Sequence, residues 1–180
     1  MLVAGVDEVG RGCLAGPVIA AAVILKNPIQ GLTDSKKLSE KTRELLAEEI
    51  KHNSFYAFGI ATAQEIDEIN ILQASLLAMK RAILALPIAP SKILVDGIHK
   101  PNININMEAI IKGDLLIKEI SAASIIAKVK RDKYMREIDL KYPNYGFKRH
   151  KGYGTKLHFE MIQKHGATKI HRKTFKGVIV

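Results

Sequence analysis

The sequence contains a single cysteine, Cys13, and no long apolar run. One cysteine cannot form a disulfide within the chain, which argues against a disulfide-stabilised secreted protein and fits a reducing compartment. The longest apolar stretch, residues 17–25, is the length of a strand and falls well short of the ~18 residues of a membrane span. Asp7 and Glu8 come too early for a secretory signal segment. We therefore expect a cytoplasmic protein that makes no membrane contact.

The sequence also lacks internal repeats, low-complexity segments and Ser-rich or Pro-rich linkers, so we expect a single domain over residues 1–180. Its net charge of +10 is unevenly distributed, because residues 148–180 carry nine Lys or Arg residues and one acidic residue, Glu160. Aromatic residues are interleaved with these charges at Tyr145, Phe147, Tyr153 and Phe159. Such a segment attracts phosphates. We expect the basic segment, about 145–180, to bind nucleic acid, with a solubilising tail as the alternative.

Hydrophobic patterning predicts both strands and helices. Strands are expected at 2–8, 17–25 and 54–63, which we interpret as an antiparallel meander, and further short strands at 92–96 and 115–118. Helices are expected at 39–51, 64–86, 119–142 and 155–165. A meander followed by strands that are separated by helices predicts an α/β fold. The sheet should be mixed, antiparallel at first and parallel later, with helices on both faces.

Four acidic residues share one local setting, between an apolar segment and a nearby glycine. They are Asp7, Glu8, Asp96 and Asp114. Carboxyl ends of strands are where sites are built in α/β sheets, and convergent carboxylates need cations to offset their repulsion. An oxygen-only ligand set suits Mg²⁺ or Mn²⁺, and two such ions about 4 Å apart can promote in-line phosphoryl displacement. We predict these acids to be catalytic and metal-binding; each could instead be a turn residue or an N-cap.

The turn Gly10-Arg11-Gly12 follows the first acidic pair and can bring backbone amides and one guanidinium close to a phosphate or a sugar. It is not a Walker loop, and a plain tight turn is the alternative. The six histidines show no zinc-binding spacing. We expect His150 and His158, which lie in the basic segment, to meet phosphate or solvent.

Several short motifs follow one another along the chain. They are residues 7–12, 15–18, 34–38, 69–74, 95–97, 112–114, 121–129 and 150–155. Together and in this order, they closely resemble the motifs of ribonuclease HII, the type 2 ribonuclease H family, from Val3 to about Phe175.

The resemblance implies a ribonuclease H-like fold and an endonuclease that hydrolyses the RNA strand of RNA–DNA hybrids. It also implies incision 5′ of single ribonucleotides in duplex DNA, leaving 3′-hydroxyl and 5′-phosphate ends. These activities belong to DNA replication and ribonucleotide excision repair. The ligands of two divalent ions, Mg²⁺ or Mn²⁺, fall on Asp7, Glu8, Asp96 and Asp114.

The resemblance also implies roles in substrate binding. Gly10, Arg11 and Gly12 match the turn that senses the 2′-hydroxyl, the group that separates RNA from DNA. Tyr153 matches a tyrosine that stacks on the sugar beyond the ribonucleotide, although a packed aromatic is the alternative. Ser35, Lys36 and Lys37 are expected to hold backbone phosphates; their alternative is a helix start with solvated lysines.

Two other functions remain open. Another metal-dependent nuclease of the same fold, such as a junction resolvase or a DNA nuclease, would need the carboxylates but no 2′-hydroxyl sensor. A non-catalytic hybrid-binding module would need one of the four acids replaced, and none is. We expect a monomer, and for Asp132 a salt bridge or support of the site residues rather than a place in the site itself. The choice between the two metal ions and a contact with a replication clamp cannot be read from the sequence.

Overall fold

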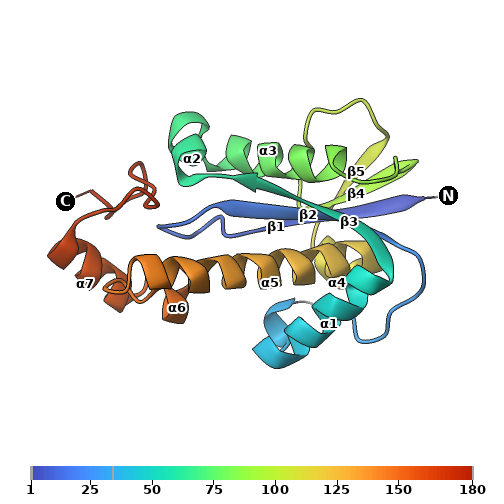
Figure 1. Ribbon diagram of the computed structural model, residues 1–180. Helices are drawn as coiled ribbons and strands as arrows, with labels where there is room; N and C mark the ends of the chain where they lie inside the picture. Colours follow the sequence, from blue (N-terminus) through green and yellow to red (C-terminus); the bar gives the residue numbers. More distant parts are fainter. Residues whose placement is uncertain (1, 34, 180) are drawn as a thin grey trace.

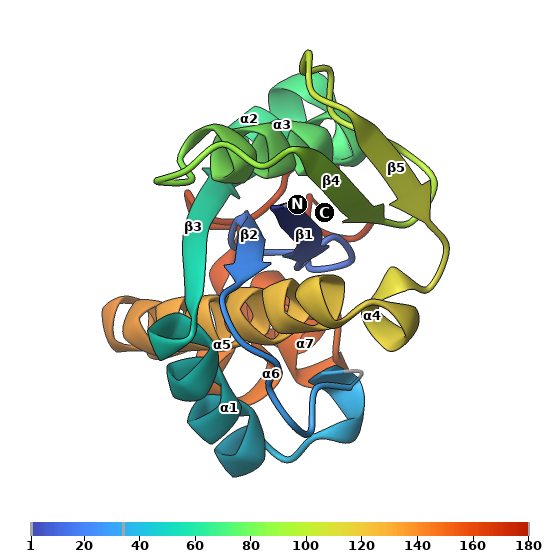
Figure 2. The same cartoon turned by 90° about the vertical axis from the view of Figure 1, so that its right-hand side faces the viewer.

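Five strands form one mixed sheet in the part of the chain that the structure, a computed structural model, describes: residues 2–33 and 35–179. The strands are β1 (Val3–Val9), β2 (Val18–Leu25), β3 (Ser54–Ala61), β4 (Lys92–Asp96) and β5 (Met107–Ile110). Their order is β3-β2-β1-β4-β5 (Figure 2). β1 to β3 pair antiparallel, whereas β1, β4 and β5 pair parallel. The predicted mixed sheet is confirmed.

Helices cover both faces of this sheet, as expected (Figures 1 and 2). One face carries α2 (Ala63–Ile69) and α3 (Ile71–Leu84), and the other carries α1 (Glu40–His52) and α5 (Lys118–Lys141). The inner strand β2, between β3 and β1, is apolar on both faces because each face packs against a helix. None of the described helices is long and apolar enough to cross a membrane.

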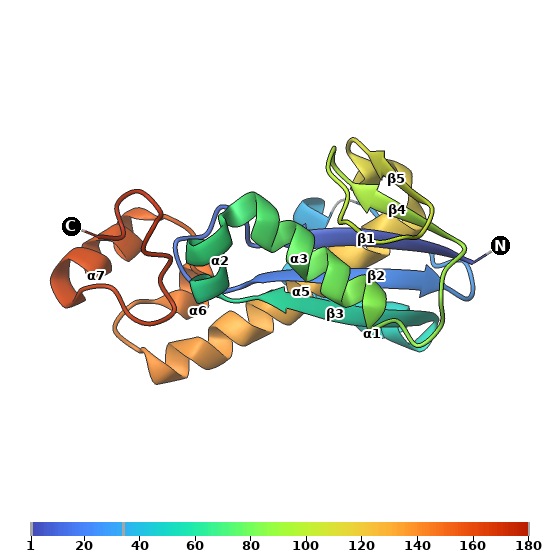
Figure 3. The same cartoon turned by 90° about the horizontal axis from the view of Figure 1, so that it is seen from above.

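The C-terminal elements form a third apolar cluster beyond one end of the sheet (Figure 3). Here α6 (Phe147–His150) and α7 (Lys156–His165) pack near the C-terminal end of α5. Tyr145 and Phe147 stack in this core with ring centroids 5.4 Å apart. His150 and His158 are also buried, so the expectation that they meet phosphate or solvent was wrong. The two rings pack on one another in the core, although the sequence around them is basic.

Three local expectations also differ from the structure. Residues 115–118 are not a strand, because Gly113–Leu116 forms the short helix α4. The edge strand β5 was not anticipated. The expected helix 64–86 is two helices, divided at Asn70, whose backbone has φ 70° and whose side chain accepts a hydrogen bond from the Gln73 amide. A 3-10 turn, η1 (Ser35–Lys37), precedes α1.

Candidate active site

One pocket lies at the carboxyl ends of the parallel strands β1 and β4. Because these strands run side by side in the same direction, their last residues meet at one edge of the sheet. The pocket is lined by Asp7, Glu8, Val9, Gly10, Arg11, Gly12, Ser35, Lys36, Asp96, Asp114, Ser124, Lys128 and Tyr153. The structure therefore brings together every predicted site residue except Lys37, which is exposed on η1 and does not line the pocket.

Backbone hydrogen bonds link the four acidic residues in two pairs. The Glu8 amide donates to Asp7 Oδ1 at 2.7 Å, and the Asp114 amide donates to Asp96 Oδ1 at 3.3 Å. Burial raises the pKa of Asp7 well above its usual range, and the charges of Glu8 and Asp96 raise it further. Burial also raises the pKa of Glu8, although Arg11 opposes this from 3.4 Å. The pocket therefore concentrates negative charge at a cost in free energy.

This donor set fits a hard divalent cation. It consists of carboxylate oxygens, which Mg²⁺ and Mn²⁺ prefer, and a positive charge would offset the burial and the repulsion that raise the two pKa values. Within residues 2–33 and 35–179, no three His, Cys, Asp or Glu side chains already form a compact metal-binding group. The carboxylates share the pocket wall but are not drawn together around one point.

The Gly10–Gly12 turn forms another side of the pocket, and its two glycines serve different needs. Gly10 has φ 96°, and a Cβ placed there would lie 2.2 Å from Nε of the buried Arg131. Gly12 would place a Cβ in open space, with nothing within 4 Å. Gly10 is therefore required by the fold, whereas Gly12 leaves room at the pocket for another molecule.

This difference gives a matched pair of variants. Gly10→Ala should lose about 1–3 kcal/mol of unfolding free energy, from the strained backbone and the contact with Arg131. Gly12→Ala should unfold within about 0.5 kcal/mol of the parent, because its methyl group meets no protein atom. Urea denaturation measures both values. Comparable destabilisation by the two substitutions would contradict this assignment.

The turn η1 is fixed beside the carboxylates by hydrogen bonds to two helices. Ser35 Oγ lies 3.1 Å from Ser124 Oγ on α5, and the Ser35 carbonyl accepts from Arg43 Nη1 on α1 at 2.7 Å. Lys36 lines the pocket from this turn. Ser35 and Lys36 of the predicted phosphate-binding segment thus lie beside the carboxylates, and phosphate binding by them stays a prediction; Asp34 of the same motif lies outside the described residues.

Tyr153 reaches the pocket from the C-terminal segment and is 39% exposed. Its backbone pairs with Cys13 in an isolated β-bridge next to the glycine turn. Burial, together with the neighbouring Cys13 thiol, raises the pKa of the Tyr153 phenol to about 12. The ring is neutral near pH 7, and its exposed part can contact a sugar or a base.

Two pocket residues were not singled out from the sequence, Ser124 and Lys128. They lie four residues apart on α5, so both face the pocket. Ser124 donates a hydrogen bond that lowers the pKa of Asp7, against the larger effect of burial. Lys128 pairs with Asp132 at 2.8 Å, which confirms the salt bridge expected for Asp132. Ser124 and Lys128 could have been found from the sequence, because both lie within motif 121–129 and their i,i+4 spacing places them on one face of the predicted helix.

The fold and this site define the class of the protein, a ribonuclease H-like protein. The family model for Ribonuclease HII matches residues 4–178. The chain belongs to the ribonuclease HII family and is a ribonuclease H endonuclease. The Ribonuclease HII of Vibrio campbellii is 57% identical over 180 residues, which cover 98% of this chain and 85% of that relative.

Solved structures agree with this assignment. The ribonuclease H2 of Pyrococcus horikoshii superposes with a TM-score of 0.82 at 30% identity, over 99% of this chain and 95% of that one. The Archaeoglobus fulgidus RNase HII, solved in a complex with PCNA, gives a TM-score of 0.82 at 27% identity, over 98% and 96%. The similarity thus extends over the whole sheet, its helices and the C-terminal elements.

Proposed function

We propose that this ribonuclease H hydrolyses the RNA strand of RNA–DNA hybrids and also incises 5′ of single ribonucleotides in duplex DNA, leaving 3′-hydroxyl and 5′-phosphate ends. One observation carries the proposal: the carboxylates, the Gly10–Gly12 turn and Tyr153 line the same pocket. A scissile phosphate beside the carboxylates therefore lies within reach of groups that can contact the neighbouring sugars.

The carboxylates of Asp7, Glu8, Asp96 and Asp114 would hold two divalent ions, Mg²⁺ or Mn²⁺. When bound, these ions supply an activated water and neutralise charge on the phosphate. The raised pKa values of Asp7 and Glu8 make cation binding compete with protons, so binding should weaken as the pH falls. Lys128 adds a positive charge to the lining of the same pocket, where it can contact a phosphate.

Recognition of the sugar is assigned to the glycine turn and to Tyr153. Backbone amides in a turn without a side chain at Gly12 can approach a ribose closely and donate to its 2′-hydroxyl. The exposed face of Tyr153 can stack on the next sugar. Ser35, Lys36 and Lys37 would contact backbone phosphates along the same strand. None of these contacts reads a base, so the activity should be independent of sequence.

The cellular setting follows from this activity. We propose a cytoplasmic monomer that acts in DNA replication and ribonucleotide excision repair on RNA–DNA hybrids and ribonucleotide-containing DNA. The Archaeoglobus fulgidus relative was solved with PCNA. A clamp contact of this chain is a prediction. Val178 is 1% exposed in the C-terminal core, so such a contact would have to use other residues.

Three labelled duplexes test the proposal: one with a single embedded ribonucleotide, one RNA–DNA hybrid and one of DNA alone. We expect cleavage of the first two with Mg²⁺ or Mn²⁺, none with EDTA, and none of the all-DNA duplex. Tyr153→Ala should slow single-ribonucleotide incision by about tenfold or more and hybrid cleavage less, since stacking contributes about 1–3 kcal/mol. Cleavage of DNA alone would favour a DNA nuclease or a resolvase, and equal losses would remove the special role of Tyr153.

A further inference from the structure

Arg172 is a fully buried cation whose hydrogen bonds go to the backbone of the glycine turn and the loop that follows it. Its Nη1 donates to the Arg11 carbonyl at 2.7 Å, and its Nη2 donates to the Gly10 carbonyl at 2.6 Å. Nε and Nη2 also donate to the Gly16 carbonyl, at 3.0 and 2.9 Å. A buried charge persists only where such partners offset its desolvation. Arg172 is therefore part of the hydrogen-bonded structure of the loop from Gly10 to Gly16.

These bonds orient the two amides that the proposed function places near the ribose. The Gly10 carbonyl belongs to the same peptide unit as the Arg11 N–H, and the Arg11 carbonyl to the same unit as the Gly12 N–H. In a planar trans peptide the C=O and N–H bonds point in opposite directions. Carbonyls drawn inward to Arg172 therefore turn the Arg11 and Gly12 amides away from the guanidinium. The same charge polarises both peptide units and strengthens their donors.

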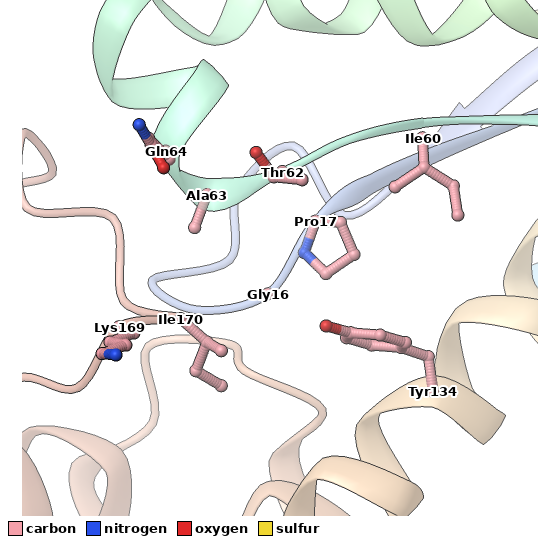
Figure 4. A pocket seen from close by; sticks show the side chains of 9 residues that line it. All are labelled: Gly16, Pro17, Ile60, Thr62, Ala63, Gln64, Tyr134, Lys169 and Ile170. Carbon is pink, nitrogen blue, oxygen red and sulfur yellow. The ribbon is translucent and has the colours of Figure 1, made fainter.

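The segment around Arg172 is anchored on both sides. The Gly16 amide donates to the Ile170 carbonyl and the Arg172 amide to the Leu14 carbonyl, both at 2.8 Å. Figure 4 shows Gly16 beside Ile170. On α2, Asp67 accepts from the amides of Lys173 at 2.9 Å and Thr174 at 3.0 Å. The guanidinium is thus held from two directions, and its position fixes the turn.

A second fully buried arginine supports the base of the same loop. Arg131 Nε donates to the Pro17 carbonyl at 2.9 Å, Nη2 to Ala15 at 3.0 Å and Nη1 to Lys151 at 2.8 Å. It joins the loop to the segment before Tyr153 but makes no bond with the Gly10 or Arg11 carbonyl among the contacts of the described residues. Orientation of the sensing amides is therefore the particular contribution of Arg172.

We propose that Arg172 is a positioning residue, which orients the Arg11 and Gly12 amides and thereby sets the preference of the site for a ribose. This inference rests on the proposed function of the glycine turn. Arg172 is far along the chain from the turn, is fully enclosed, and touches no substrate. Its effect passes through two peptide units, so it should appear in the rate of the bound complex rather than in duplex affinity.

The test is single-turnover cleavage of the single-ribonucleotide duplex by Arg172→Lys, which keeps the charge but loses the forked geometry. At saturating enzyme the rate constant should fall about 100-fold, as expected for misplaced reacting groups. The reaction amplitude and the dissociation constant for the all-DNA duplex should remain unchanged. Ile162→Val is the matched control: it truncates the same C-terminal core, which lowers stability, and should keep the parental rate constant.

A folded Arg172→Lys protein with a rate constant within about twofold of the parent would overturn the proposal. So would a loss of rate that disappears as the enzyme concentration is raised to saturation, because a smaller folded fraction alone produces that result. If Arg172→Lys does not fold, Asp67→Ala is the alternative variant, because it removes the hydrogen bonds that hold the backbone of Lys173 and Thr174. This variant should lower the rate constant at constant amplitude. An unchanged rate constant would overturn the proposal. A parent protein that does not discriminate between the ribonucleotide and all-DNA duplexes would instead overturn the proposed function, and this inference with it.

Discussion

Asp7→Asn should abolish cleavage and at the same time stabilise the metal-free protein. The substitution removes a charged ligand from the proposed metal site, and loss of several kcal/mol of transition-state stabilisation lowers the rate at least about a thousandfold. Stability changes in the other direction because the folded state raises the pKa of Asp7 through burial and the neighbouring Glu8 and Asp96. Above its unfolded pKa this carboxylate is therefore charged at a cost, which the neutral amide avoids.

The melting temperature in EDTA at pH 7 should be higher for Asp7→Asn than for the parent, by about 2–4 °C for each kcal/mol gained. Added Mg²⁺ should reduce this difference, because the cation stabilises the parent more than the variant. Glu65→Gln is a control of opposite sign. A hydrogen bond from Arg81 lowers the pKa of Glu65 to about 2, so its neutral variant should melt lower and keep full activity. A lower melting temperature for Asp7→Asn in EDTA would contradict the account.

The pocket carboxylates could be singled out from the sequence because each lies where an apolar segment meets a glycine-containing turn. Asp96 ends an apolar strand and Asp7 lies two residues before the end of another, and glycine follows closely in both cases. Parallel pairing of β1 with β4 then brings these ends together, as a simple rule of α/β sheets predicts. The wrong or missing predictions of secondary structure concerned short segments. Residues 115–118 are apolar over too few positions to distinguish a strand from a helical turn, and β5 spans only Met107–Ile110.

The supporting residues could not be located in the same way, because their role depends on contacts across the chain. In the sequence, Arg172 contributes to the basic segment and resembles its lysine neighbours. In the structure it is fully buried and bonds to Gly10, more than 150 positions away. His158 likewise counted as part of a surface for phosphates, yet it has no exposed area. Net charge describes a segment, but only packing decides which of its members face solvent.

The buried histidines form a hydrogen-bonded relay that fixes their protonation. The Thr168 amide donates to His171 Nδ1 at 2.9 Å, so His171 carries its proton on Nε2. That proton points to His158 Nε2 at 3.1 Å, which leaves the His158 proton on Nδ1, 2.9 Å from the Tyr153 carbonyl. His150 stacks on His158 with ring centroids 4.3 Å apart. Every ring is neutral in this arrangement, and the last bond of the relay holds the backbone of Tyr153.

Acid should therefore destabilise the protein through this relay. Burial lowers the pKa of His158 to about 4, and it does the same for His171, with the nearby histidines adding to the effect. A histidine in the unfolded chain has a pKa of about 6.5. Between pH 6.5 and 4 the unfolded state binds protons that the folded state excludes, so stability is lost as the pH falls through this range. For one such residue the loss at pH 4 is about 3 kcal/mol.

The measurement is urea unfolding in EDTA from pH 7.5 to 4, for the parent, His158→Phe and His52→Gln. Asp7 and Glu8 have raised pKa values, so their contribution to the stability of the folded protein increases as the pH falls. This contribution is the same in all three proteins and cancels when their stabilities are compared. The parent should lose about 3 kcal/mol more than His158→Phe between pH 7 and 4. His52 is exposed, and its variant should follow the parent. Parallel curves for the parent and His158→Phe would show that the relay is not what resists acid. Divergence would show that the pH sensitivity of this fold originates in the same hydrogen bonds that hold the Tyr153 segment in the active site.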